Sequence, residues 1–111
     1  MVDEHTIKDA ADALLQAAPA GSMVILFGSY AKGVAGPDSD LDFLVVEPQV
    51  QDRFNEMFRL RKALEPVLGG QILPVDVIVM RENRFRETKE VPNTLSNEVS
   101  LKGRVYERSA S

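Results

Sequence analysis

The sequence has no cysteine and only one histidine, His5. Without cysteine the chain has no disulfide, no thiolate zinc site and no cysteine nucleophile. A lone histidine in a polar N-terminal stretch supports neither a Ser-His-Asp triad nor a histidine-rich metal site. Any catalysis must therefore use carboxylates, hydroxyls, backbone amides and cations.

An excess of positive charge and long apolar runs are also missing. Seventeen acidic and thirteen basic side chains give a net charge of −4, which repels phosphate backbones and disfavours a long nucleic-acid substrate. No segment approaches the roughly 20 apolar residues of a membrane span, and the N-terminus has no basic region followed by an apolar stretch. We therefore expect a cytoplasmic protein without membrane attachment.

What the chain does contain is the composition of one globular domain. It has 111 residues, of which 44% are hydrophobic and 27% charged, and no linker, repeat or low-complexity segment. A chain of this length supports one compact core rather than two. We expect a single domain over residues 1–111.

Apolar residues follow helical and strand spacing in alternation along the chain. Helical spacing predicts a first helix over residues 7–18 and a second over residues 50–68, the latter ended by Pro66 and Gly69-Gly70. Continuous apolar runs predict strands over residues 23–27, 40–46 and 75–79. About a dozen residues separate the first two strands, too few for a parallel crossover, whereas the second helix gives the next pair room for one. The expected fold is α/β (α+β), a small mixed sheet flanked by helices.

Two further segments have simpler interpretations. The helical spacing of Phe54, Met57 and Phe58 is more typical of a core than of a partner groove. Residues 81–111 contain charged, helical-looking stretches, and a Val105-Tyr106 pair that could dock on the core.

Three acids define a candidate catalytic patch. Because side chains alternate along a strand, Asp40 and Asp42 should share one face, and Asp76 joins them if its strand lies alongside. At about 7 Å and an effective dielectric of 20, each ionised pair repels by about 2.4 kcal/mol, which a divalent cation would offset. With neither His nor Cys nearby, oxygen ligands suit Mg²⁺ or Mn²⁺. The alternative is a solvated strand face, with Asp76 as an edge-strand acid that discourages aggregation.

A glycine and a serine follow the first strand. Gly28 lets the backbone approach a ligand closely, and a helix that begins at Ser29 would aim its free amides at a phosphate. A strand-ending glycine followed by a serine N-cap is the commoner meaning of such a pair alone. Walker, Rossmann and EF-hand motifs all fail here, because Val34, Tyr30 and Phe43 stand where those motifs need lysine, glycine and glycine.

Together these residues resemble a known signature. Gly28-Ser29, ten residues and then Asp40-Leu41-Asp42, with a later acid in Val75-Asp76-Val77, look like the GS-x10-DxD pattern of the DNA polymerase β nucleotidyltransferase superfamily. The resemblance spans about residues 7–107, and Gly33 and the Ser39 to Phe43 string also fit it. Within that superfamily it most resembles the minimal nucleotidyltransferases, antitoxins that are usually paired with a HEPN toxin.

The resemblance implies a fold, a reaction and a role for each matching position. It implies a polymerase-β-like nucleotidyltransferase fold and a protein adenylyltransferase that moves AMP from ATP to a tyrosine hydroxyl of the toxin. Asp40, Asp42 and Asp76 would be catalytic and would hold Mg²⁺ or Mn²⁺, and Gly28 and Ser29 would hold the nucleotide phosphates.

Two positions beside that signature have weaker interpretations. Lys32 is a candidate phosphate contact, although a plain exposed lysine fits equally well. Tyr30 stands where many relatives carry a basic residue, and it is better explained as a surface or partly packed aromatic than as a base-stacking residue.

Three hypotheses stay open at this point. The first is the enzyme, whose acceptor cleft a partner protein or a homo-oligomer would complete. The second is an inactive binding module that neutralises its toxin by contact alone. The third is a plain calcium or magnesium binder, which metal would stabilise but nucleotide would not protect.

Overall fold

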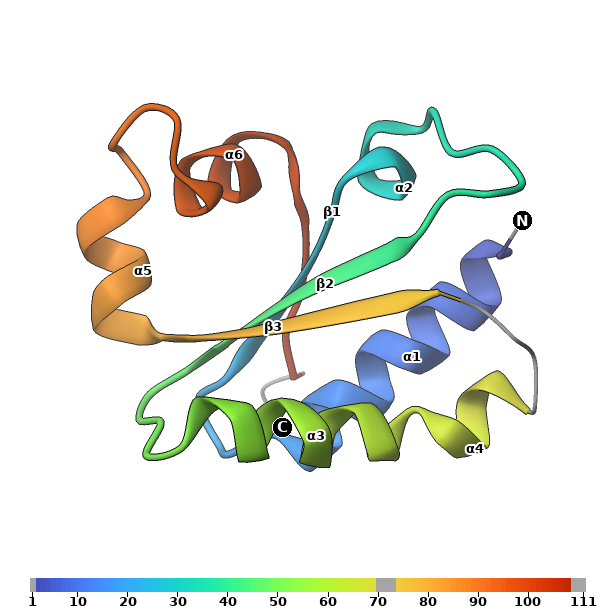
Figure 1. The fold of residues 1–111 in the computed structure, drawn as a ribbon, viewed down its shortest axis with the longest axis horizontal. Coiled ribbons are helices and arrows are strands. Elements are labelled where there is room, and N and C mark those ends of the chain that lie inside the picture. The colour runs from blue at the N-terminus through green and yellow to red at the C-terminus, as the bar shows by residue number, and fades with distance from the viewer. Residues whose placement is uncertain (1, 70–73, 109–111) are drawn as a thin grey trace.

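The structure, a computed structural model, describes residues 2–69 and 74–108. This part of the chain contains six helices and four strands (Figure 1). In chain order they are α1 (Glu4–Ala17), β1 (Met23–Phe27), α2 (Ser29–Lys32), β2 (Leu41–Glu47), α3 (Arg53–Ala63), α4 (Glu65–Leu68), β3 (Val75–Arg81), α5 (Glu82–Thr88), α6 (Leu95–Lys102) and β4 (Arg104–Tyr106).

The four strands form one mixed sheet in the order β3-β2-β1-β4. β1 runs antiparallel to β2, and β2 runs parallel to β3. The connection lengths predict both directions, because the short α2 segment cannot carry a parallel crossover whereas α3 and α4 can. The mixed α/β architecture expected from the sequence is therefore confirmed.

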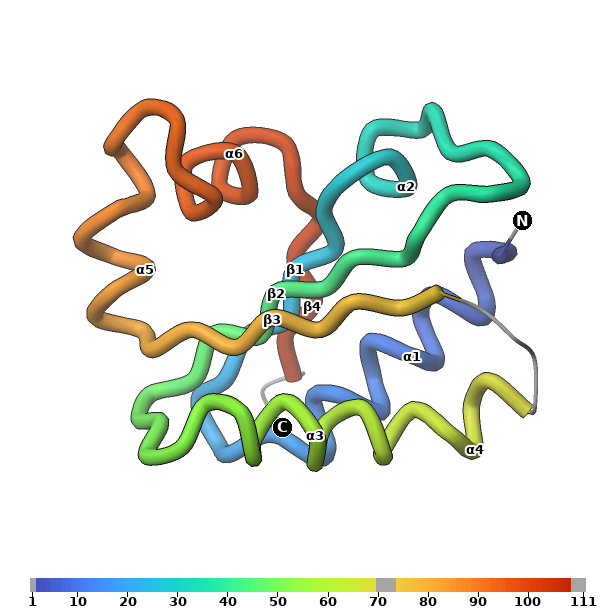
Figure 2. The backbone as a smooth tube through the Cα atoms, viewed as in Figure 1, coloured from blue at the N-terminus to red at the C-terminus, as the bar shows by residue number. Residues whose placement is uncertain are grey.

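Helices cover both faces of this sheet, as the ribbon and the backbone tube show (Figures 1 and 2). The main apolar cluster packs α1 and α3 against inward residues of the strands, among them Phe43 and Val77. A smaller cluster on the other face contains Leu44 and Val46 and reaches α6 through Val99. Because β2 is covered on both sides, five of its seven residues are apolar.

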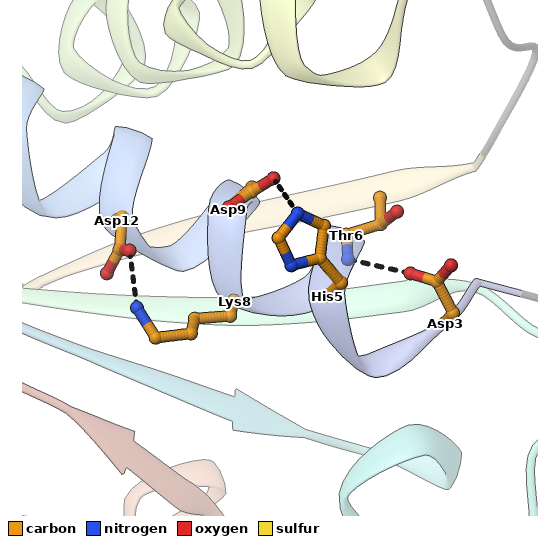
Figure 3. A network of polar contacts seen from close by, with 6 residues as sticks. All are labelled: Asp3, His5, Thr6, Lys8, Asp9 and Asp12. Carbon is orange, nitrogen blue, oxygen red and sulfur yellow. Dashed lines mark hydrogen bonds and ion pairs between the residues drawn. The ribbon is translucent and has the colours of Figure 1, made fainter.

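The first helix shows the expected division into a buried and a polar face. Asp3 caps it by accepting a hydrogen bond from the Thr6 amide at 2.8 Å. On the exposed face His5 lies 3.3 Å from Asp9, and Lys8 lies 2.9 Å from Asp12 (Figure 3). The only histidine of the chain is therefore part of a surface pair on α1.

The second predicted helix is two helices in the structure. α3 begins at Arg53, so Val50 lies in the preceding loop. The helix is interrupted at Leu64, between the end of α3 at Ala63 and the start of α4 at Glu65. Pro66 stands in the first turn of α4 and so begins a helix rather than ending one. Its missing amide hydrogen is tolerated in a first turn but not in a helix interior. Gly69 ends α4 in a left-handed conformation, and Gly70 lies outside the described residues.

The prediction that Phe54 and Phe58 belong to the core is wrong. Their side chains are 66% and 67% exposed, whereas Leu60 of the same helix is fully buried. Met57, which packs partly against the core, and Leu60 mark the inward side of α3. At 100° per residue, Phe54 and Phe58 lie roughly 90 to 130° away from that side. Their spacing is helical, but the stripe they form is not the one that packs.

The last third of the chain holds α5, α6 and the short strand β4. The helical stretches expected after residue 81 are present, and Val105 and Tyr106 join the sheet through pairing with β1 rather than by docking on it. Val105 stays 54% exposed on that strand. Across residues 2–69 and 74–108, the structure contains no helix with the length and apolar character needed to cross a bilayer.

Candidate metal and phosphate site

The three aspartates singled out by the sequence meet at one end of the sheet. Asp42 and Asp76 are partners in the parallel register of β2 and β3, and Asp40 lies just before β2. One carboxylate oxygen from each of the three lies within 4.8 Å of the others. The predicted gathering of Asp40, Asp42 and Asp76 is therefore present in the structure.

Strand alternation explains why these side chains converge. Leu41 and Phe43, the neighbours of Asp42, are fully buried in the main core, and so Asp42 points to the opposite face. Asp76 is likewise flanked by two buried valines. The two acids are register partners on adjacent parallel strands, and each stands between two core residues. Their side chains therefore lie side by side on the same face of the sheet.

The electrostatics of the cluster favour a cation. Burial raises the pKa of Asp42, and the negative charges of Asp76 and Asp40 raise it further. Asp42 is half-buried, whereas the other two aspartates are exposed and open to a ligand. In the described part of the chain, these three form the one group of three carboxylates close enough to share an ion. An all-oxygen donor set of this kind fits Mg²⁺ or Mn²⁺.

Gly28 lies directly against this cluster. It follows Phe27, the register partner of Asp42, and has a φ of +77°. A Cβ at this position would lie 2.5 Å from Oδ2 of Asp42. Only glycine adopts this conformation easily and leaves that space free. The turn from β1 into α2 is thereby held beside the carboxylates.

The α2 segment begins at that turn. Gly28 occupies the N-cap of α2, and Ser29 is its first residue. The first amides of a helix have no intrahelical acceptor, so the amides of α2 start next to Asp42. Gly33 ends the helix in a left-handed conformation, and the Gly36 amide donates to Ser39 Oγ at 2.8 Å in the following loop. The two sequence motifs, Gly-Ser and Asp-x-Asp, are therefore adjacent in space.

Lys32 and Tyr30 have partners elsewhere in the protein. Lys32 Nζ donates to Oε1 of Glu98 on α6 at 3.1 Å, so this phosphate candidate is engaged in an ion pair. Tyr30 is 8% exposed and accepts a hydrogen bond from the Val2 amide, so it is a core residue rather than a surface aromatic. Nothing in the sequence marks Glu98, because it lies 66 residues from Lys32 and only the fold brings the two together.

Comparison with known families adds a match over almost the whole chain. The family model described as nucleotidyltransferase domain matches residues 7–105. That span includes both the Gly28-Ser29 motif and the three aspartates. The poly(A) polymerase PAPalpha of Candida albicans is 41% identical over 66 residues, which are 54% of this chain and 12% of that protein. The chain thus spans about an eighth of that relative.

Solved structures share the fold at lower identity. A toxin–antitoxin crystal structure with AMP-PNP superposes with a TM-score of 0.59 at 21% identity, covering 96% of this chain and 75% of the other. A crystal structure of a mutant of the toxin–antitoxin MntA-HpeT gives the same TM-score and identity, covering 98% of this chain and 75% of the other. A protein from Sulfolobus solfataricus assigned as a nucleotidyltransferase gives 0.55 at 24% identity over 78% and 73%.

Proposed function

The chain belongs to the nucleotidyltransferase domain family, and we propose that it transfers AMP from ATP to a hydroxyl of a partner protein. The observation that carries this proposal is the meeting of Asp40, Asp42 and Asp76 beside the Gly28 turn. A cluster of acids next to free helix amides offers places for a divalent cation and for phosphates at neighbouring positions.

Each acid has a part in this proposal. Asp40, Asp42 and Asp76 would hold Mg²⁺ or Mn²⁺, which when bound neutralises charge on the phosphates and on the leaving group. Asp76, exposed at the edge of the cluster, would accept the proton of the attacking hydroxyl. The hydroxyl oxygen forms a bond to the α-phosphorus of ATP, the bond from that phosphorus to the bridging oxygen breaks, and pyrophosphate leaves.

The turn after β1 would bind the triphosphate. The Gly28-Ser29 backbone would lie along the β and γ phosphates, beside Asp42, which leaves no room for a side chain at Gly28. Lys32 would contribute a positive charge once a phosphate competes with Glu98 for it. The ion pair is exposed on both sides and therefore weak, so this exchange costs little.

The acceptor in this proposal is a tyrosine of a HEPN toxin, and the chain acts as its antitoxin in the cytoplasm. The similarity to toxin–antitoxin structures, one with AMP-PNP, supports this choice of partner and nucleotide. Modification of the tyrosine would inactivate the toxin.

The proposal is tested by following the α-phosphate of labelled ATP. The protein is incubated with Mg²⁺ and the protein encoded by the neighbouring gene, and wild type is compared with Asp42→Asn and Asp38→Asn. Asp38 lies two residues before the cluster in the same loop and is not part of it, so Asp38→Asn is a matched control. We expect label on the partner with wild type and Asp38→Asn and none with Asp42→Asn. Neutralisation of the partner without label, unchanged in Asp42→Asn, would instead identify a binding module.

A further inference from the structure

The outer edge of β3 has no partner strand in residues 2–69 and 74–108. The sheet order places β3 at one end, beside β2 only, and β3 is seven residues long. A free edge presents unpaired amide and carbonyl groups, which monomeric proteins usually blunt with charge, proline or a bulge. The stretch Val77–Met80 is wholly apolar, and its register with β2 is continuous. β3 therefore offers a template for another strand, whereas β4 at the opposite edge has only three residues.

The exposed phenylalanines of α3 lie on the side of that helix that faces this edge. Phe58 lines a hollow of about 370 Å³ together with Val75 of β3. The other flank of α3 faces away from β3, because Arg59 lines a different hollow together with Pro19. Phe54 stands one helical turn before Phe58 and shares its flank. Since α3 and α4 run along β3 (Figure 1), the two rings and the free edge form one continuous surface.

The hollow at the start of β3 is suited to an aromatic side chain. Phe58, Leu64, Leu68 and Val75 give it apolar walls. Phe54 of the same chain is not one of its walls, and its ring is mostly exposed to water. Burying an exposed aromatic ring in an apolar hollow is a main source of binding free energy at protein interfaces.

The two ends of the β3 edge carry opposite charges. Asp76 and the exposed Asp40 lie at its start. At its end, Arg53, Arg81 and Arg84 line a hollow of about 640 Å³ that has no acidic wall. Within the described residues, the arginines that form ion pairs are others. An acidic or a basic partner segment would suit only one end, whereas an antiparallel copy of the same edge sets a negative end against a positive end twice.

We infer that two copies of this chain associate through β3, as antiparallel edge strands that extend the sheet from one copy into the other. The two-fold axis passes near Ile78, the middle residue of β3, and makes the contact self-complementary. Because Arg53 and Arg81 line one hollow, the start of α3 lies at the end of β3. Phe54 of one copy therefore arrives at the start of β3 in the other, where its ring enters the apolar hollow. This contact is independent of the proposed transfer of AMP.

Sedimentation equilibrium of the full chain at increasing concentration tests the inference. We expect twice the mass of one chain at high concentration and reversible dissociation on dilution. Phe54→Ser should weaken association by about tenfold or more, because it removes the aromatic anchor. Leu101→Ser, at a similarly exposed apolar position on α6, is the matched control and should associate like wild type. A monomer at every concentration, or unchanged association of Phe54→Ser, overturns the inference.

A folding defect is excluded by a separate measurement. In dilute solution, where the chain is monomeric, Phe54→Ser and Leu101→Ser should both keep the wild-type free energy of unfolding within about 0.5 kcal/mol, as surface substitutions usually do. Weaker association with unchanged unfolding then supports an interface at Phe54. Association and unfolding that fall together in Phe54→Ser would make it a folding residue and contradict the inference.

The absence of cysteine allows a direct test of which edge pairs. Ile78→Cys places a thiol near the two-fold axis, where opposed Cβ atoms of paired strands lie about 4.5 to 5.5 Å apart. A short bis-maleimide should therefore link two copies of Ile78→Cys. Val105→Cys on β4 is the control for the opposite edge and should give no linked pair. A dimer that is linked through Val105→Cys and not through Ile78→Cys would contradict pairing through β3.

The same variants separate a second copy from a different partner. If wild type is monomeric, and the protein encoded by the neighbouring gene binds it but not Phe54→Ser, the surface belongs to that protein and the inference is wrong. The proposed transfer of AMP is read from label and from Asp42→Asn, so either proposal can fail without the other.

Discussion

Gly28 and Asp42 are packed against each other, so that a methyl group on the glycine would lie 2.5 Å from a carboxylate oxygen of the aspartate. This contact joins the two motifs of the candidate site, because Gly28 directly follows β1 and Asp42 stands near the start of β2. The space taken by a side chain at Gly28 is the space in which Asp42 must lie to share an ion with Asp40 and Asp76. The glycine is thus a condition for the carboxylate cluster.

Replacing Gly28 by alanine should damage both stability and metal binding. The substitution has two costs. A positive φ costs about 1 to 2 kcal/mol for a residue with a Cβ, and the added Cβ clashes with Asp42. Gly33 also has a positive φ but open space around it, and Gly36 has open space and no positive φ. In urea unfolding, Gly28→Ala should therefore lose the most free energy of unfolding, Gly33→Ala less and Gly36→Ala the least. Only Gly28→Ala should also lose Mn²⁺ affinity. Equal losses in Gly28→Ala and Gly33→Ala would show that the Asp42 contact has no effect.

Removing the charge of Asp42 should stabilise the metal-free protein. Its pKa is raised by burial and by its acidic neighbours, so ionisation of Asp42 costs folding free energy as the pH rises through its titration. Asp42→Asn should raise the melting temperature at pH 7 without metal, by a few degrees at most. The same variant should lose the further rise that Mg²⁺ gives wild type. A destabilised Asp42→Asn would mean that the repulsion is too weak to matter.

The buried Glu47 should make stability fall as the pH rises. Its folded-state pKa of about 8 lies above the ordinary value of 4.5, so between these values the folded state holds a proton that the unfolded state has lost. Stability from this group is full below about pH 4.5 and is lost as the pH passes 8. The free energy of unfolding of wild type, measured with denaturant, should therefore fall between pH 6 and pH 9. In Glu47→Gln it should change less with pH. Parallel slopes in the two proteins would contradict the assignment.

The exposed phenylalanines of α3 should contribute little to folding. Phe58→Ser should change the free energy of unfolding by no more than about 0.5 kcal/mol, as surface substitutions usually do. Phe43→Ala, in the fully buried centre of β2, should cost about 3 to 5 kcal/mol. Chemical denaturation measures both. If Phe58→Ser lost as much free energy of unfolding as Phe43→Ala, Phe58 would have to be a core residue.

The sequence predicts the centre of the sheet and the site because these depend on local periodicity. β1 follows from a continuous apolar run. The gathering of Asp40, Asp42 and Asp76 follows from strand alternation and from which connections have room for a parallel crossover. Gly28 could be linked to the site for its backbone freedom, but its contact with Asp42 depends on the register of β1 against β2.

What the sequence could not predict depends on contacts between distant segments. β4 is three residues long and becomes a strand only by pairing with β1, so it has no periodicity of its own. The Lys32–Glu98 pair joins two short helices across 66 residues. Phe54 and Phe58 have helical spacing, and the spacing does not say which side of α3 faces the sheet. Glu47 looks like the polar end of a strand until α3 covers it.

The central claim is that three aspartates hold one metal site for a nucleotide, and Mn²⁺ binding tests it most directly. Mn²⁺ is titrated into the protein with a non-hydrolysable ATP analogue, and free Mn²⁺ is followed by electron paramagnetic resonance. We predict saturable binding by wild type and by Asp38→Asn, and at least tenfold weaker binding by Asp40→Asn, Asp42→Asn and Asp76→Asn. Wild-type affinity in Asp76→Asn would contradict the account, because β3 would then take no part in the site.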